Sequence, residues 1–188
     1  MMIKTLLVYA HLIAACLAVG ILLIQDLALV KWQGRAMNIE AIENLQRNSG
    51  IVSLALVALW VTGLIIVAIG CIDNPAYLMN QKLWAKFSVV SILTINGLFL
   101  HFYSFPRLTA PQGFLGTNTA EQFIVLVTAV VSLVSWLYAC YLGIARPWNN
   151  VATYVYVMTV YTVIFIVSLL VALECWRGLR SGFRSVIR

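Results

Sequence analysis

Hydrophobic positions gather along the chain in five long runs rather than in short alternating ones. The runs cover approximately residues 6–30, 51–70, 83–105, 123–145 and 152–173. A run of about 20 apolar residues in helical conformation is long enough to cross the hydrocarbon core of a bilayer. The pattern therefore predicts an all-α, polytopic membrane bundle of five transmembrane helices, formed as one domain over residues 1–188.

Composition agrees with this prediction. The chain is 63% hydrophobic and 10% charged, whereas a soluble domain has about 45–50% apolar and about 25% charged residues. The net charge is +6, but no basic run is interleaved with aromatic residues as a nucleic-acid-binding groove would need. We therefore expect the chain to contact the lipid bilayer and no nucleic acid. The sequence has no CxxC pair, Gly-rich phosphate loop or HExxH. The commonest enzyme motifs are thus missing, and whether the chain is an enzyme stays open.

Basic residues separate between the two ends of the predicted bundle. One end has Lys4, Lys82, Lys86 and Arg146, and the other collects Lys31, Arg35, Arg47, Arg107, Arg177, Arg180, Arg184 and Arg188. Lys and Arg are enriched on the cytoplasmic side of membrane proteins. We therefore expect the N-terminus outside, the C-terminus in the cytoplasm, and a cytoplasmic, partly helical connection over residues 31–50.

Two of the predicted helices carry ionisable residues within the apolar runs. The first contains His11 and Asp26, and the third contains Lys86 and His101, with the same spacing of 15 residues in each case. This spacing corresponds to about 22 Å along a helix and to a rotation of only about 60°. If the two helices are neighbours, His11 and Lys86 share an outer polar layer and Asp26 and His101 share an inner one, which Glu174 could join.

The two layers favour different chemistry. In the outer layer, a neutral His11 could ligate a metal or a haem iron, while the Lys86 ammonium pairs with a carboxylate such as a haem propionate. In the inner layer, a carboxylate beside an imidazole fixes the tautomer of the ring. The alternative is that these groups satisfy each other and anchor helix ends, with Lys86 extending toward the interface. One haem held by both histidines is not expected, because the two residues lie at different depths.

Several short motifs resemble those of a known group of membrane proteins. Ala10 and His11, residues 60–63 (WVTG), residues 76–80 (AYLMN) and residues 83–86 (LWAK) are similar to an uncharacterised family of small bacterial inner-membrane proteins. That family in turn resembles the copper-resistance D proteins and the J-type protoporphyrinogen oxidases. The resemblance covers about the first 108 residues and implies a multi-pass protein of the bacterial inner membrane with a haem- or metal-linked redox role.

The same resemblance assigns the cofactor-binding roles. His11 would match the early histidine of the group, as the metal or haem ligand, and Lys86 would match its lysine. The first helix lacks an arginine after His11 and carries Asp26 near its end, which differs from the oxidase pattern. No Met-rich or His-rich external segment supports a copper protein.

Three functions remain open from the sequence. The first is binding of haem b or a metal in electron transfer or a related redox step. The second is a small transporter or a proton- or cation-conducting permease component, in which the two polar layers mark a path across the bilayer. The third is an accessory subunit of a membrane complex, whose buried polar groups pair with another chain. The protein could also form a homo-oligomer.

Overall fold

The computed structural model describes residues 2–32 and 36–187, with side chains up to residue 181. Arg35 and Arg188, and the side chain of Arg184, lie outside the described part. The helices are α1 (Met2–Val30), α2 (Ile39–Asp73), α3 (Gln81–Phe99), α4 (Phe105–Leu108), α5 (Thr119–Ile144) and α6 (Tyr154–Ile187). A π-helical turn, η2 (Leu100–Ser104), joins α3 to α4, and 3-10 segments occur at η1 (Pro75–Met79), η3 (Phe114–Gly116) and η4 (Arg146–Trp148).

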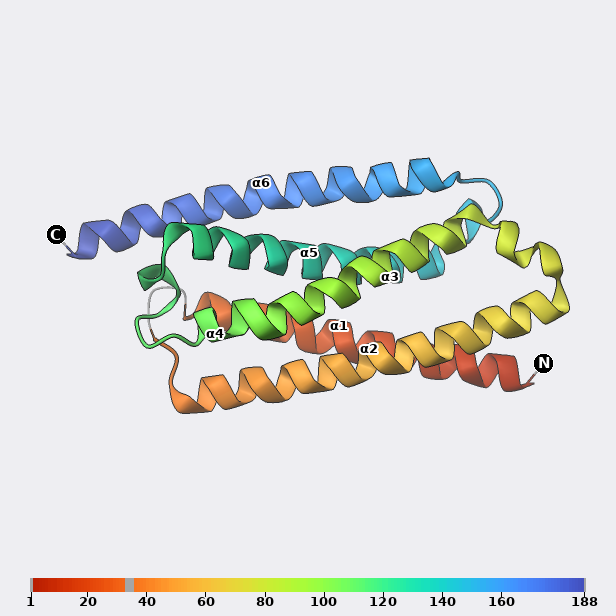
Figure 1. Ribbon diagram of the computed structural model, residues 1–188, viewed down its shortest axis with the longest axis horizontal. Helices are drawn as coiled ribbons and strands as arrows, with labels where there is room; N and C mark the ends of the chain where they lie inside the picture. Colours follow the sequence, from red (N-terminus) through yellow and green to blue (C-terminus); the bar gives the residue numbers. More distant parts are fainter. Residues whose placement is uncertain (1, 33–35, 188) are drawn as a thin grey trace.

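The prediction of five helices that can span a membrane is confirmed. Within the described residues, the segments that are long and apolar enough are Met2–Val30, Ile39–Asp73, Gln81–Leu108, Thr119–Ile144 and Tyr154–Ser181. They run along one long axis, with the two termini at opposite ends of the bundle (Figure 1). Large apolar side chains cover the outside, for example Leu27 at 71% and Val155 at 72% exposure. This surface suits contact with lipid and gives the chain a multi-pass membrane architecture.

The helices extend further than the apolar runs from which they were predicted. Helix α2 begins at Ile39 rather than at residue 51, because the Asn38 side chain accepts a hydrogen bond from the Ala41 backbone N–H at 2.9 Å and caps the helix. Glu40 in the first turn also favours helix formation there, since its negative charge faces the positive end of the helix dipole. Much of the connection over residues 31–50 is thus a continuation of α2. At the other end of the chain, α6 continues beyond residue 173 as far as Ile187.

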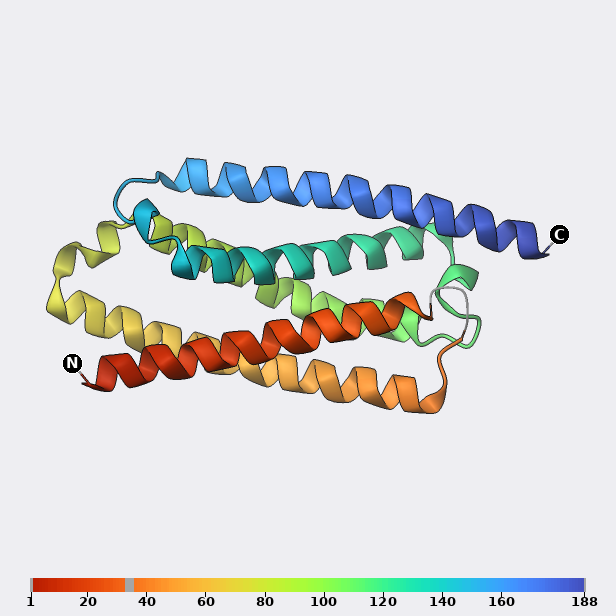
Figure 2. The same cartoon turned by 180° about the vertical axis from the view of Figure 1, so that it is seen from behind.

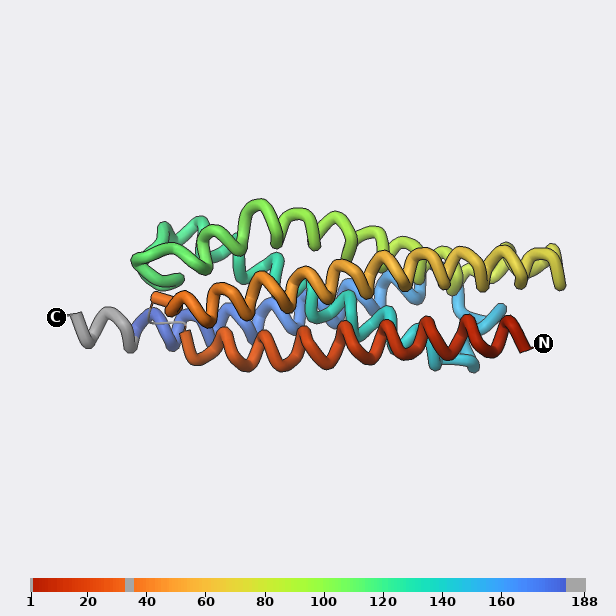
Figure 3. The backbone as a smooth tube through the Cα atoms, turned by 90° about the horizontal axis from the view of Figure 1, so that it is seen from below, coloured from red at the N-terminus to blue at the C-terminus, as the bar shows by residue number. Residues whose placement is uncertain are grey.

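The helices pack as two units. Helices α1 and α2 run side by side as a hairpin (Figure 3). Helix α5 packs on both α3 and α6, and α6 lies on the side of the bundle away from α1 and α2 (Figures 1 and 2). The core of this second unit contains Ala85, Val89, Val130, Val134, Tyr138, Leu142, Val157 and Tyr161. We call the interface between the α1–α2 hairpin and helices α3 and α5 the seam.

A smaller apolar cluster fills the middle of the seam. It consists of Ala18, Leu22, Ala55, Leu93 and Trp136, which come from α1, α2, α3 and α5. One hydrogen bond also crosses between the units, from the Trp60 indole N–H on α2 to the Thr94 hydroxyl on α3, at 3.0 Å. The predicted pairs lie on either side of this cluster, His11 and Lys86 on one side and Asp26 and His101 on the other.

The π-helical turn follows from the position of Pro106. A proline has no backbone N–H and its ring collides with the carbonyl four residues earlier, so a regular α-helix cannot continue through it. Here the chain widens before the proline, and the Phe105 N–H bonds to the Leu100 carbonyl five residues back. Such turns are often found at functional sites, and this one contains His101.

Hydrogen bonds of Lys82 link the start of α3 to the end of α5. Its ammonium donates to the Ala145 carbonyl at 2.7 Å and to Asn149 Oδ1 at 3.0 Å, and the residue is only 7% exposed.

We expect Lys82→Met to lower the free energy of unfolding by about 1–3 kcal/mol, because a buried carbonyl loses its donor. Lys4→Met is the matched control, since the Lys4–Asp73 pair is exposed and should contribute at most about 1 kcal/mol. Denaturant titration in mild detergent compares the two variants, and equal losses would contradict this assignment.

Candidate functional site

His11 is held on α2 by a hydrogen bond that determines its tautomer. His11 Nδ1 lies 2.7 Å from Thr62 Oγ1, and the Thr62 hydroxyl lies 2.7 Å from the Ala58 carbonyl. A carbonyl can only accept, so the Thr62 hydroxyl donates to Ala58 and must accept from His11. The proton of the neutral ring is therefore on Nδ1, and the lone pair of Nε2 is available. The ring lies against α2 at Gly63, where a Cβ would be 3.4 Å from His11 Cε1.

Lys86 approaches His11 from across the seam. Its ammonium is within electrostatic reach of the His11 ring and of the Cys140 thiol on α5. A Cβ at Gly143 would lie 3.8 Å from Lys86 Nζ, so the lysine passes close to the α5 backbone. No hydrogen bond or ion pair in the described part of the chain involves the ammonium. We call His11, Thr62 and Lys86 the His11 layer.

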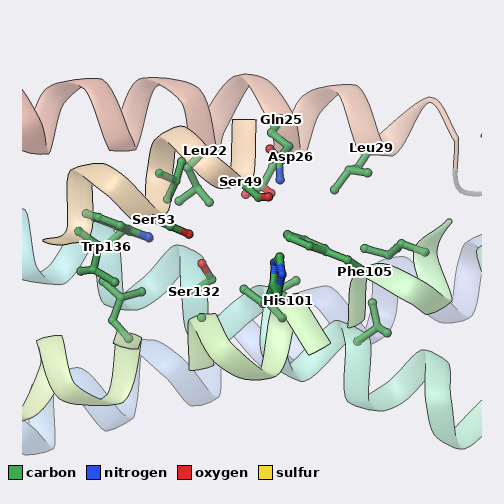
Figure 4. Close-up of a pocket in the computed structure, with 18 residues that line it drawn as sticks. Leu22, Gln25, Asp26, Leu29, Ser49, Ser53, His101, Phe105, Ser132 and Trp136 are labelled. Carbon is green, nitrogen blue, oxygen red and sulfur yellow. The ribbon is translucent and has the colours of Figure 1, made fainter. Parts of the chain in front are cut away.

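A cavity of about 100 Å³ lies at the other side of the apolar cluster. Its walls come from α1, α2, the end of α3 with η2, and α5 (Figure 4). His101 points across the cavity toward the wall that carries Asp26 and Ser49 (Figure 4). We call this the Asp26 cavity, and its polar lining residues are Gln25, Asp26, Ser49, Ser53, His101 and Ser132.

Several polar side chains that line this cavity have no hydrogen-bond partner among the described residues. No hydrogen bond or ion pair from a described residue reaches the Asp26 carboxylate. The Gln25 Oε1 atom is fully buried and accepts no hydrogen bond within the described residues. His101 is exposed and has ring contacts, edge-on to Phe102 at 5.1 Å and to Phe105 at 6.4 Å between ring centroids. The cavity lining thus combines a half-buried carboxylate with an exposed imidazole.

The seam places the residues singled out from the sequence in a fixed order. Along α1 the order is His11, the apolar Ala18 and Leu22, then Asp26, and along α3 and η2 it is Lys86, Leu93, then His101. The structure therefore brings His11 near Lys86, and Asp26 near His101, with apolar packing between the two pairs.

Glu174 lies apart from both pairs. It is on α6, away from the seam, and its carboxylate forms an exposed ion pair with Arg177 at 2.7 Å. Glu174 does not line the Asp26 cavity. The reason is topological, because α5 and α3 stand between α6 and the hairpin (Figures 1 and 2).

Sequence reasoning missed Gln25 and the role of Thr62. Gln25 immediately precedes Asp26 within an apolar run. An uncharged polar residue in such a run could have indicated a buried polar site. Thr62 entered the sequence analysis only as part of the WVTG motif at residues 60–63. Its contact with His11 depends on the register between α1 and α2, and no sequence pattern gives that register.

Comparison with known proteins adds no relative. No protein-family model, curated protein or solved structure matches this chain. The resemblance to the copper-resistance D group stays a prediction.

The tautomer of His11 can be tested directly. In Thr62→Val the acceptor of the Nδ1 proton is replaced by a methyl group of the same size, so the neutral ring should lose its preference for the Nδ1–H form. Nitrogen NMR of labelled histidine in detergent distinguishes the two tautomers. Thr94→Val is the control, because it removes the partner of Trp60 and leaves His11 untouched. An Nδ1–H signal unchanged by Thr62→Val would contradict the assignment.

Proposed function

We propose that this chain is a small membrane transporter that passes protons through the seam. The observation that carries the proposal is the unpaired Asp26 carboxylate facing His101 in a cavity within apolar helices. An ionisable side chain at such a position is costly, and in membrane proteins it usually marks an ion or proton path. A carboxylate and an imidazole together can accept and release protons near neutral pH.

The order of polar and apolar groups along the seam is compatible with transport across a closed barrier. Polar groups lie toward one end of the seam in the His11 layer and toward the other end in the Asp26 cavity. The apolar cluster around Leu22, Leu93 and Trp136 closes the middle. Passage of a proton requires the residues of this cluster to separate. The division into two packing units allows this, because the α1–α2 hairpin can move as a rigid body against α3 and α5.

The orientation belongs to the same proposal. The start of α2, helix α4, the end of α6 and the end of α1 lie at the same end of the bundle (Figure 1). The first three of these segments carry Arg47, Arg107, Arg177 and Arg180, and the end of α1 carries Asp26. Because Lys and Arg favour the cytoplasmic side, we place the Asp26 cavity toward the cytoplasm and His11 toward the outside of a bacterial inner membrane.

Proton passage is measurable in proteoliposomes with a trapped pH dye. A pH step is applied with K⁺ and valinomycin on both sides, so that charge is compensated. Wild-type protein should collapse the gradient faster than empty liposomes, and Asp26→Asn should slow the rate by about tenfold or more, because the carboxamide cannot carry a proton. Asp73→Asn is the matched control, since Asp73 lies at the surface in a pair with Lys4. Equal rates for wild type and Asp26→Asn would refute the proposal.

A second function, haem binding at His11, has its own support. The Thr62 hydrogen bond leaves Nε2 free as a ligand, which is how metal-binding histidines are usually oriented. Lys86 provides a positive charge nearby for a propionate. The described residues include no group of three or more His, Cys, Asp or Glu that could hold a metal ion. A haem would need only one protein ligand at this place, which His11 would supply with Lys86 beside a propionate, and the haem would bring one-electron chemistry.

An absorption spectrum tests this second function. If the protein holds haem b, the purified protein in mild detergent should show a Soret band that shifts with dithionite and is lost in His11→Ala. His101→Ala is the control, because His101 lies on the other side of the apolar cluster and the band should be unchanged. A colourless wild-type protein after expression with added haem precursor would exclude haem at His11.

A further inference from the structure

A groove of about 430 Å³ runs between α5 and α6. This volume falls within the roughly 300–1,000 Å³ of sites that hold organic molecules. Figure 2 shows the two helices side by side, with α3 behind them. The groove shares no lining residue with the Asp26 cavity. We call it the α5–α6 groove, and its described lining residues are Leu133, Val134, Leu137, Tyr138, Tyr141, Trp148, Tyr156, Val160, Ile164 and Ser168.

The floor of the groove is buried and its walls reach the lipid-facing surface. Val134 and Tyr138 belong to the core shared with α3 and are 5% and 4% exposed. Leu137 on α5 and Ile164 on α6 are 44% and 40% exposed. On α6 the lining residues recur every four positions over residues 156–168, which is about 18 Å at 1.5 Å per residue. A ligand with a long apolar tail can therefore enter from the bilayer and lie along the helices.

Aromatic rings form one end of the groove. Trp148 lies edge-on to Tyr141 at 5.3 Å and to Tyr156 at 5.5 Å between ring centroids. Tyr138 stacks with Tyr141 at 6.1 Å. Aromatic residues are common at membrane interfaces, but these four also contact one another and line a single groove. Such a lining favours a planar ring, which can stack on an aromatic side chain or lie edge-on to it.

Two of the tyrosine hydroxyls in this end have no partner in the described part of the chain. The Tyr138 hydroxyl donates to the Val157 carbonyl at 2.6 Å. The Tyr141 and Tyr156 side chains are within electrostatic reach of Tyr138, and their hydroxyls form no hydrogen bond with a described residue. A phenol hydroxyl can donate one hydrogen bond. The aromatic end thus presents two donors to a ligand that carries acceptor oxygens.

The absence of charge in the groove separates the candidate ligands. None of the described lining residues is charged, so the phosphate of a phospholipid would find no counter-charge there. A helix of a second copy of this chain would not satisfy the two hydroxyls, because its backbone carbonyls are already bonded within the helix. An uncharged flat ring with carbonyl oxygens and an apolar tail matches the rings, the donors and the length of the groove.

We propose that the α5–α6 groove binds an isoprenoid quinone from the bilayer. The quinone ring lies among Tyr141, Trp148 and Tyr156, and the two tyrosine hydroxyls donate to its carbonyl oxygens. The isoprenoid tail lies along Val160 and Ile164. This site goes beyond the proton path, because its lining is separate from the Asp26 cavity.

Photolabelling of the full-length protein in proteoliposomes tests the proposal. The probe is an azido-ubiquinone with a short alkyl tail, and mass spectrometry of peptides locates the label. We expect saturable labelling within residues 133–168 that excess decylubiquinone removes, although phospholipid is present throughout. The double variant Tyr141→Phe, Tyr156→Phe should raise the half-saturating probe concentration by about tenfold, because it keeps both rings and loses two hydrogen bonds. Leu137→Trp should remove the label, because the larger side chain fills the groove.

Matched controls separate lost binding from misfolding. Tyr9→Phe changes an exposed tyrosine of α1 outside the groove and should label like the wild type. The double variant should unfold at the same denaturant concentration as the wild type, since neither hydroxyl has a partner in the described chain.

Three results would overturn the proposal. The first is label spread over all lipid-facing helices, and the second is label that decylubiquinone does not displace. Either result would assign the groove to phospholipid or to a second copy of the chain. The third is equal half-saturation of the wild type and the double variant, which would remove the two tyrosine hydroxyls as quinone ligands.

Discussion

Hydrocarbon around the helices supplies no hydrogen bonds, so every polar group in the bundle must find its partner inside the protein. Most of the described polar side chains follow this rule. Asn96 donates to the Thr128 carbonyl at 2.9 Å, and Ser104 pairs with the Thr128 hydroxyl at 2.9 Å. Among the described residues, Asp26, Gln25 Oε1, Lys86 and the buried Ser132 hydroxyl depart from it. These residues belong to the seam, with Lys86 on one side of the apolar cluster and the others on the opposite side.

The packing explains why these groups are at the seam. Helices α3, α5 and α6 share a continuous core in which Tyr138 and Ser135 are satisfied by Val157 and Tyr161. The α1–α2 hairpin has its own close contact. Between the units the apolar contacts among the described residues include the cluster around Leu22 and Trp136 and the ring contact of Trp60 with Phe87. An interface that is not fully packed can hold a cavity and can change shape, and both properties are needed for transport.

Sequence reasoning predicted part of this arrangement for clear physical reasons. Hydropathy and length were sufficient for the five helices, because a bilayer imposes a minimum apolar length. The equal 15-residue spacings indicated which ionisable residues could share a level, since the rise per residue of a helix is constant. Helix order in space was not predictable, and Glu174 shows the effect: it has the right depth along α6 but lies on the wrong side of α5.

Individual side-chain hydrogen bonds could not be predicted from the sequence either. The bond between His11 and Thr62 joins residues 51 positions apart, and it depends on how far α1 is shifted along α2. The early start of α2 depended on the Asn38 cap, which precedes a charged stretch, residues 39–50, that lies outside the apolar run. The third span was predicted to end at residue 105, whereas the backbone accommodates Pro106 by widening at residues 100–104 and the helical span continues to Leu108.

The long-range bonds of Lys82 have a consequence for biogenesis. Its acceptors on Ala145 and Asn149 lie 63 and 67 residues later in the chain. During synthesis α3 is therefore made before the residues that accept the Lys82 hydrogen bonds exist. The α1–α2 hairpin, by contrast, completes its main contact from the first 73 residues. We expect the Lys82 ammonium to extend toward the membrane interface from the first turn of α3 until the end of α5 is made.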